Sequence, residues 1–155
     1  MTRDQLTSCL EKLKGKHILV VEDQALFADI LLRLTKQHGI RLSHAESGNK
    51  AIKAIEENTP DVILLDLLLP DMDGLEFAQF VRRNENTKSV PIIAMSGEPR
   101  RRESSLQNGC NAFIQKPFRL PELFSQIRPR TLQRVQGSHQ STDHKLQKRI
   151  EDDAN

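Results

Sequence analysis

Short apolar segments alternate with helix-like segments along most of this chain. Residues 17–21, 61–66 and 91–95 are apolar runs of the kind expected for strands that are buried on both faces. Two further strands are predicted at 41–45 and 112–115. Between and after the strands, apolar residues at helical spacing and capping residues predict helices at 24–37, 47–57, 75–83, 99–107 and 120–128.

Five strands that alternate with five helices through short connections predict an α/β fold with a parallel sheet covered on both faces. Right-handed crossovers then favour a doubly wound open sheet. The pattern covers residues 16–128, which is the length of one domain. The remaining residues are predicted to form an N-terminal extension at 1–15 and a polar C-terminal tail or linker at 129–155.

Composition excludes several classes of protein. Hydrophobic residues make up 37% of the chain and charged residues 28%, which is typical of a soluble globular domain. No apolar run approaches the roughly 20 residues that span a bilayer, and the polar N-terminus is not a secretory signal, so we expect a cytoplasmic protein without a membrane partner. Cys9 and Cys110 are expected to be reduced thiols. The net charge is +2 and neither end is strongly basic, so no direct nucleic-acid partner is expected.

Three acidic residues lie at the ends of predicted strands. Glu22 and Asp23 come directly after the first strand, and Asp66 ends the third. Parallel strands end at one edge of the sheet, which is where doubly wound folds bind ligands. Carboxylates gathered there repel one another unless a cation lies among them, and Mg²⁺ is the hard divalent ion that best suits oxygen ligands. An acidic pair after a strand is also explained by a helix N-cap, so these residues alone leave both interpretations open.

Two residues at the ends of the last two strands add matching chemistry. Ser96 follows the fourth strand and offers a hydroxyl donor, and Lys116 follows the fifth and offers an ammonium group. A carboxylate nucleophile with a metal, a hydroxyl and a lysine around it is what phosphoryl transfer to an aspartate requires. The sequence therefore favours phosphoryl transfer to Asp66.

The segments VVED, LLDLLLPDMDG, AMSG and FIQKP, in this order and spacing, resemble the receiver domains of two-component response regulators. This resemblance covers about residues 16–128. It implies a flavodoxin-like sheet with strand order 2-1-3-4-5. It also implies a phosphoprotein that works in a phosphorelay.

The resemblance assigns a role to each matching residue. Asp66 is expected to be the phosphoacceptor, and Glu22 and Asp23 are expected to hold Mg²⁺ together with Asp66. The backbone carbonyl of Leu68 would be a further metal ligand. The family commonly has Asp where this chain has Glu22, so the longer side chain is expected to reach the metal through water.

The resemblance also assigns the phosphoryl-binding and switch residues. Ser96 and Lys116 are expected to bind the phosphoryl oxygens, and the Lys116–Pro117 bond is expected to be cis. Phe113 occupies the aromatic switch position but lacks the hydroxyl of the usual tyrosine. Leu68 cannot hydrogen-bond an attacking water, so we expect a comparatively long-lived phosphoaspartate.

The expected function is a signalling module that accepts a phosphoryl group from a histidine kinase or phosphotransfer protein. It is not expected to be an enzyme, since it would catalyse only its own Mg²⁺-dependent phosphorylation. A downstream protein target is expected to bind the surface formed by residues 99–107, 112–115 and 120–128. The sequence is also compatible with a homodimer. Two rival hypotheses are a pseudo-receiver adaptor and a Mg²⁺-dependent phosphatase. The chain could be a stand-alone receiver or a piece of a larger regulator or hybrid kinase.

Two further motifs have a structural and a functional interpretation. Arg100, Arg101 and Arg102 open a predicted helix, where they form either a solvated face or a docking site for an acidic partner. Asp71 and Asp73 are predicted to lie in a tight turn. Their spacing also resembles a motif of haloacid dehalogenase-like phosphatases, but the Thr of that motif is absent and no strand directly precedes them.

Overall fold

The computed structural model describes residues 2–127 and residue 130. The predicted end of the last helix at Arg128, and the tail from 129 onward except Arg130, lie outside the described residues. The helices are α1 (Arg3–Lys12), α2 (Ala25–Gln37), α3 (Gly48–Glu57), α4 (Gly74–Arg83), α5 (Arg101–Gln107) and a final helix that begins at Leu120. The strands are β1 (His17–Val21), β2 (Arg41–Ala45), β3 (Val62–Asp66), β4 (Ile92–Ser96) and β5 (Ala112–Gln115).

The sheet confirms the predicted fold class. Its strands lie in the order β2-β1-β3-β4-β5, and all neighbouring pairs are parallel. Three strands have the predicted bounds, β3 begins one residue later than predicted, and β4 both begins and ends one residue later, so that Ser96 is its last residue. The predicted helix caps are also present: Ser47 Oγ accepts a hydrogen bond from the Lys50 amide, and Gly39 after α2 has a φ of 69°.

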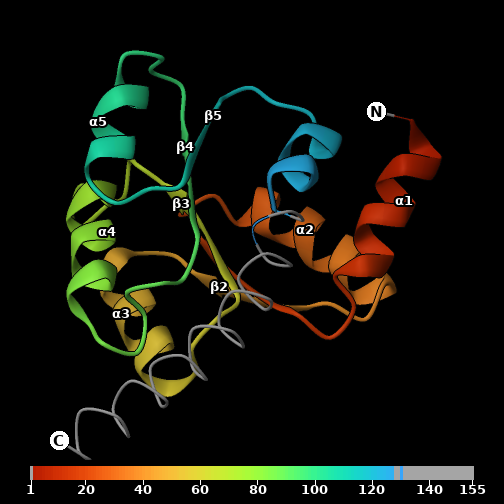
Figure 1. Cartoon of the computed structure of the whole chain (residues 1–155), viewed down its shortest axis with the longest axis horizontal. Helices are drawn as coiled ribbons and strands as arrows, with labels where there is room; N and C mark the ends of the chain where they lie inside the picture. The colour runs from red at the N-terminus through yellow and green to blue at the C-terminus, as the bar shows by residue number, and fades with distance from the viewer. Residues whose placement is uncertain (1, 128–129, 131–155) are drawn as a thin grey trace, which may run out of the picture.

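Two apolar cores cover the two faces of the sheet. Along β1, Leu19 and Val21 belong to the core under α3 and α4, whereas Ile18 and Val20 belong to the core under α2 and the final helix. Figure 1 shows this layering, with α3, α4 and α5 on one side of the sheet and α2 and the final helix on the other. A strand with alternate residues in two cores must be apolar throughout, which explains the continuous apolar runs in the sequence.

Helix α1 is an addition to the five predicted helices. Thr2 and Gln5 form a capping box at its start, with the Gln5 amide 3.2 Å from Thr2 Oγ1. Leu10 and Leu13 are 1% and 0% exposed and join the core under α2, and Leu6 packs against it. The segment is helical because its leucines recur at helical spacing behind a capping box.

The two cysteines agree with the expectation from the sequence. Cys9 and Cys110 are free, as predicted, and both are buried. Burial raises the pKa of the Cys110 thiol to about 11, so it stays protonated near neutral pH. Among the described helices, none is both long enough and apolar enough to cross a membrane.

Candidate functional site

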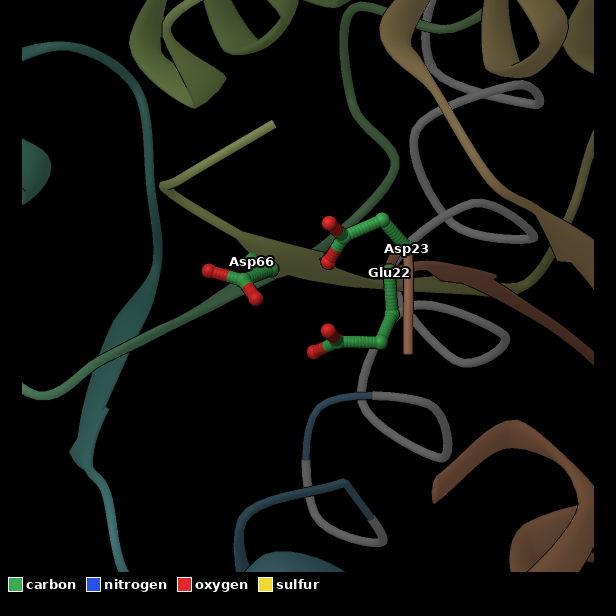
Figure 2. A group of neighbouring side chains, drawn as sticks. All are labelled: Glu22, Asp23 and Asp66. Atoms are coloured by element: carbon green, nitrogen blue, oxygen red, sulfur yellow. The ribbon is translucent and has the colours of Figure 1, made fainter. Parts of the chain in front are cut away.

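The carboxyl edge of the sheet brings three acidic side chains together. Glu22 follows β1 directly, and Asp66 ends β3, the strand next to β1. Figure 2 shows the carboxyl groups of Glu22, Asp23 and Asp66 facing a common space, and ligand oxygens from all three lie within 4.8 Å of one another. Glu22 is fully buried and Asp66 is 6% exposed, whereas Asp23 is exposed to solvent. The cluster is therefore open on the Asp23 side.

Lys116 joins this cluster from the end of β5. Its Nζ lies 2.9 Å from Glu22 Oε2 and 2.9 Å from Asp66 Oδ2. The Lys116 amide donates to the Ser96 carbonyl at 2.8 Å, which holds the lysine beside β4. The Lys116–Pro117 bond is cis, which is the form expected.

Burial and neighbouring charges shift two pKa values in the cluster. Burial raises the pKa of Glu22 to about 7, and the nearby Asp66 carboxylate adds to this rise while Lys116 opposes it. Burial lowers the pKa of Lys116, but its hydrogen bonds to Asp66 and Glu22 outweigh burial and the net shift is upward. Lys116 is thus held as an ammonium group, and the cluster keeps more carboxylates than cations.

The donor set fits a hard divalent cation. Within residues 2–127 and residue 130, these carboxylates are the one group of three or more His, Cys, Asp or Glu side chains close enough together to share an ion. All their donor atoms are carboxylate oxygens, which suit Mg²⁺ better than softer metals. A single ammonium group does not neutralise three carboxylates, so a cation on the exposed side would relieve their repulsion.

The segment after β3 fixes the orientation of Asp66. The Leu68 amide donates to Asp66 Oδ1 at 2.9 Å, while the Leu68 side chain is 79% exposed. Gly74 begins α4 directly against this segment, because a Cβ there would lie 2.6 Å from Leu67 Cα and 2.7 Å from the Asp66 carbonyl oxygen. Only glycine lets α4 begin this close to the backbone of β3.

Ser96 and Phe113 lie on the side of the site formed by β4 and β5. Ser96 ends β4 and is 7% exposed, and its Oγ accepts a hydrogen bond from the Glu98 amide at 3.0 Å. Phe113 is 6% exposed and packs in the core under α4. The Arg102 guanidinium lies over its ring at 5.1 Å from the centroid, which is a cation–π contact.

Sequence reasoning missed several residues that support the site. His44 Nε2 donates to the Glu22 carbonyl oxygen at 2.6 Å. Asp71 accepts from the amides of Gly48 and Asn49 at the start of α3, and Asp73 caps α4. Asp73 directly precedes α4, which is the usual sequence signal of a helix cap, whereas Asp71 contacts the start of α3 from more than 20 positions away and has no such local signal.

Known relatives share this sequence pattern. The family model of the response regulator receiver domain matches residues 18–128. The phosphate regulon transcriptional regulatory protein PhoB of Klebsiella pneumoniae is 34% identical over 116 residues, which are 74% of this chain and 51% of that protein. The polar-differentiation response regulator DivK of Brucella ovis is 30% identical over 115 residues, which are 73% of this chain and 94% of DivK. The chain thus spans about half the length of PhoB but nearly all of DivK.

A solved structure shares both sequence and fold. It is the receiver domain of a sensor histidine kinase from Pseudomonas aeruginosa PAO1, with a magnesium ion coordinated in its active site cleft. It is 32% identical, has a TM-score of 0.68 and covers 76% of this chain and 98% of its own. The family match over residues 18–128, the confirmed sheet order and the clustered carboxylates together show that this chain belongs to the response regulator receiver domain family of two-component signalling.

Proposed function

We propose that this protein is a phosphorylation switch in which Asp66 accepts a phosphoryl group from a histidine kinase or phosphotransfer protein. One observation carries the proposal. The Asp66 carboxylate is held between Lys116 Nζ and the Leu68 amide, each at 2.9 Å, within a group of three carboxylates that fits a divalent cation. A positioned carboxylate with cations around it can act as a nucleophile toward a phosphoryl group.

The proposed transfer needs little more than charge neutralisation. A bond forms between a carboxylate oxygen of Asp66 and phosphorus, and the bond between phosphorus and the donor's imidazole nitrogen breaks. The imidazole keeps the electron pair and takes up a proton. Lys116 offsets negative charge on the phosphoryl oxygens, and the Ser96 hydroxyl donates a hydrogen bond to one of them.

Glu22, Asp23, Asp66 and the Leu68 carbonyl would hold Mg²⁺ in this protein. When bound, the ion supplies positive charge to the phosphoryl oxygens. Burial raises the pKa of Glu22 to about 7 while Lys116 favours its ionised form, so the ionised fraction of Glu22 depends on pH near neutrality. The carboxylates are better metal ligands at pH 8 than at pH 6 for this reason.

The output is proposed to be a change in protein–protein contacts on the surface formed by α5, β5 and the final helix. A groove of about 510 Å³ on this surface is lined by Arg102, Phe113, Lys116 and Glu122 among others. Ser96 on β4 lies between Asp66 on β3 and strand β5, whose Phe113 lines the groove, so a movement of Ser96 toward a phosphoryl group would reach this surface. We propose a downstream protein as the partner, and the protein's product is its own phosphorylated state.

Incubation with acetyl phosphate and Mg²⁺ at pH 8 tests the proposal. Intact mass spectrometry is expected to show one phosphoryl group per chain, and EDTA is expected to prevent the labelling. No labelling under these conditions would indicate an adaptor that has the fold without the transfer. Repeated turnover of a small phosphoester would indicate a phosphatase, and either outcome would reject the proposal.

Leu68→Asn is expected to shorten the lifetime of phosphorylated Asp66. The Leu68 side chain is 79% exposed, so its replacement should leave the fold intact, and an amide beside Asp66 can orient a water for hydrolysis. We expect hydrolysis to become about tenfold faster, equivalent to about 1.4 kcal/mol in the barrier. Loss of the mass increment over time measures this, with Leu106→Asn on α5 as the control. Equal lifetimes in both variants would argue against the role of Leu68.

A further inference from the structure

The three consecutive arginines at the start of α5 have different surroundings. The Arg100 side chain is 86% exposed and contacts Glu98, with 3.2 Å between Nε and Oε2. The Arg101 side chain is 21% exposed, and its Nη2 lies 2.7 Å from both carboxylate oxygens of Asp73. Arg101 therefore contacts the segment that follows the proposed phosphoacceptor, which is not expected of an arginine in a solvated face.

Asp73 is closely tied to the backbone beside the site. It pairs with Leu68 in an isolated antiparallel bridge, and the Gly74 amide donates to the Leu67 carbonyl at 2.9 Å. Arg101 Nη1 also approaches the Leu67 carbonyl oxygen at 3.5 Å. The residues from Leu67 to Asp73 thus form a short closed loop, and Arg101 contacts the loop where its two ends meet.

We propose that Arg101 is a positioning residue for the cation site. By holding Asp73, it keeps the bridge partner Leu68 in place, and Leu68 supplies both the amide that orients Asp66 and the carbonyl proposed as a metal ligand. The inference rests on the proposed function, since it concerns the same site. Outer contacts that fix a ligand commonly change metal affinity by about 10- to 100-fold when they are removed.

Charge and position predict opposite effects, which makes the proposal testable. Arg101 is a cation near a site for a cation, so the loss of its charge alone would strengthen Mg²⁺ binding. The loss of its positioning contact would weaken Mg²⁺ binding. Arg100→Gln is the matched control, because it removes the same charge from the preceding residue, whose contact with Glu98 does not reach the loop.

Isothermal titration with Mg²⁺ at pH 8, on the full chain without a phosphodonor, measures the effect. We expect Arg101→Gln to bind Mg²⁺ about tenfold more weakly than Arg100→Gln, with little change in Tm in the absence of the metal. Arg101→Lys keeps the charge without the planar guanidinium and is expected to fall between Arg101→Gln and the unaltered protein. If Arg101→Gln fails to fold, the Mg²⁺ affinity of Arg101→Lys provides the test in its place.

A double-mutant cycle tests the route through Asp73. Asp73→Asn keeps a capping residue at the start of α4 but removes the ion pair. If Arg101 acts through Asp73, the two changes together should weaken binding by less than the product of their separate effects. The positioning role alone would be overturned if Arg101→Gln bound Mg²⁺ as tightly as Arg100→Gln, or more tightly. It would also be overturned if the combined effect in the double-mutant cycle equalled the product of the two separate effects. Absence of Mg²⁺ binding by the unaltered protein would overturn the proposed function together with it.

Discussion

Asp66→Asn is expected to reduce labelling by acetyl phosphate at least about 100-fold, because an amide lacks the negative charge that makes the carboxylate a nucleophile. The other acidic side chains of the cluster are poor substitutes. Glu22 is fully buried against Lys116, and Asp23 is exposed, with no hydrogen bond to its carboxylate from the part of the chain that the structure describes. Intact mass spectrometry after incubation with Mg²⁺ and acetyl phosphate measures the loss.

The same change should leave the protein folded. Lys116 keeps its contact with Glu22 at 2.9 Å, and the removal of one carboxylate lowers the repulsion within the cluster. The pKa of Glu22 should then fall, since the Asp66 charge contributes to its rise. Mg²⁺ affinity should still decrease, because the site has one ligand fewer.

Asp71→Asn is the matched control for Asp66→Asn. Asp71 lies in the loop after β3, and it accepts hydrogen bonds from the α3 amides, which an asparagine can partly replace. We expect this variant to be labelled as fully as the unaltered protein. Full labelling of Asp66→Asn, with the phosphoryl group mapped to another residue, would contradict the assignment.

The sheet could be predicted from the sequence because its central strands are buried on both faces. Every residue of β1, β3 and β4 is buried, so these strands appear as continuous apolar runs. The ends of parallel strands share an edge, so the neighbourhood of Glu22, Asp66 and Lys116 also followed from the sequence. The predicted grouping of these side chains agrees with the structure.

The pairings within the site could not be predicted, because they depend on side-chain conformations and on distant residues. Glu22 meets Lys116 at 2.9 Å in the structure, a pairing that was not predicted from the sequence. Asp73 and Arg101 are 28 positions apart and lie in separate predicted elements. A run of arginines is usually a solvated face, and only the fold shows that its middle member contacts the loop beside Asp66.

The sequence contains the signals of helix α1 but does not show which surface the helix packs against. The capping residues Thr2 and Gln5 and the spacing of Leu6, Leu10 and Leu13 are typical of an amphipathic helix. A short amphipathic helix is marginal alone and needs an apolar surface to cover. That surface is the core under α2 and the final helix, which includes Leu31, Phe124 and Ile127.

Leu10→Ala is expected to destabilise the protein by about 3 kcal/mol and to lower Tm by about 10 °C. Leu10 is 1% exposed within the core under α2, so truncation would leave a cavity that the surrounding helices cannot fill. Thermal unfolding followed by circular dichroism measures the change. Leu26→Ala is the matched control, since Leu26 is 74% exposed and its truncation should cost less than about 1 kcal/mol.

Removal of residues 1–15 should have a larger effect than either substitution. The family match begins at residue 18, so a chain that starts at Lys16 retains everything that the family model describes. It would nevertheless lose Cys9, Leu10 and Leu13, which are buried, and would expose the apolar surface beneath them. Each leucine contributes about 2 kcal/mol by burial, and whole domains are stable by only about 5–15 kcal/mol.

We therefore expect the shortened chain to be partly unfolded or aggregated at 37 °C and to show a Tm at least about 10 °C below that of the full chain. Exposed apolar surface on this side of the sheet would also promote self-association, which size-exclusion chromatography detects. A shortened chain that stays monomeric with a Tm within about 3 °C of the full chain would contradict the role of α1. The folding unit would then begin near β1, and the helix would be an attachment to it. If Tm instead falls by the larger amount, α1 is part of the core that holds β1 in place, and with it Glu22.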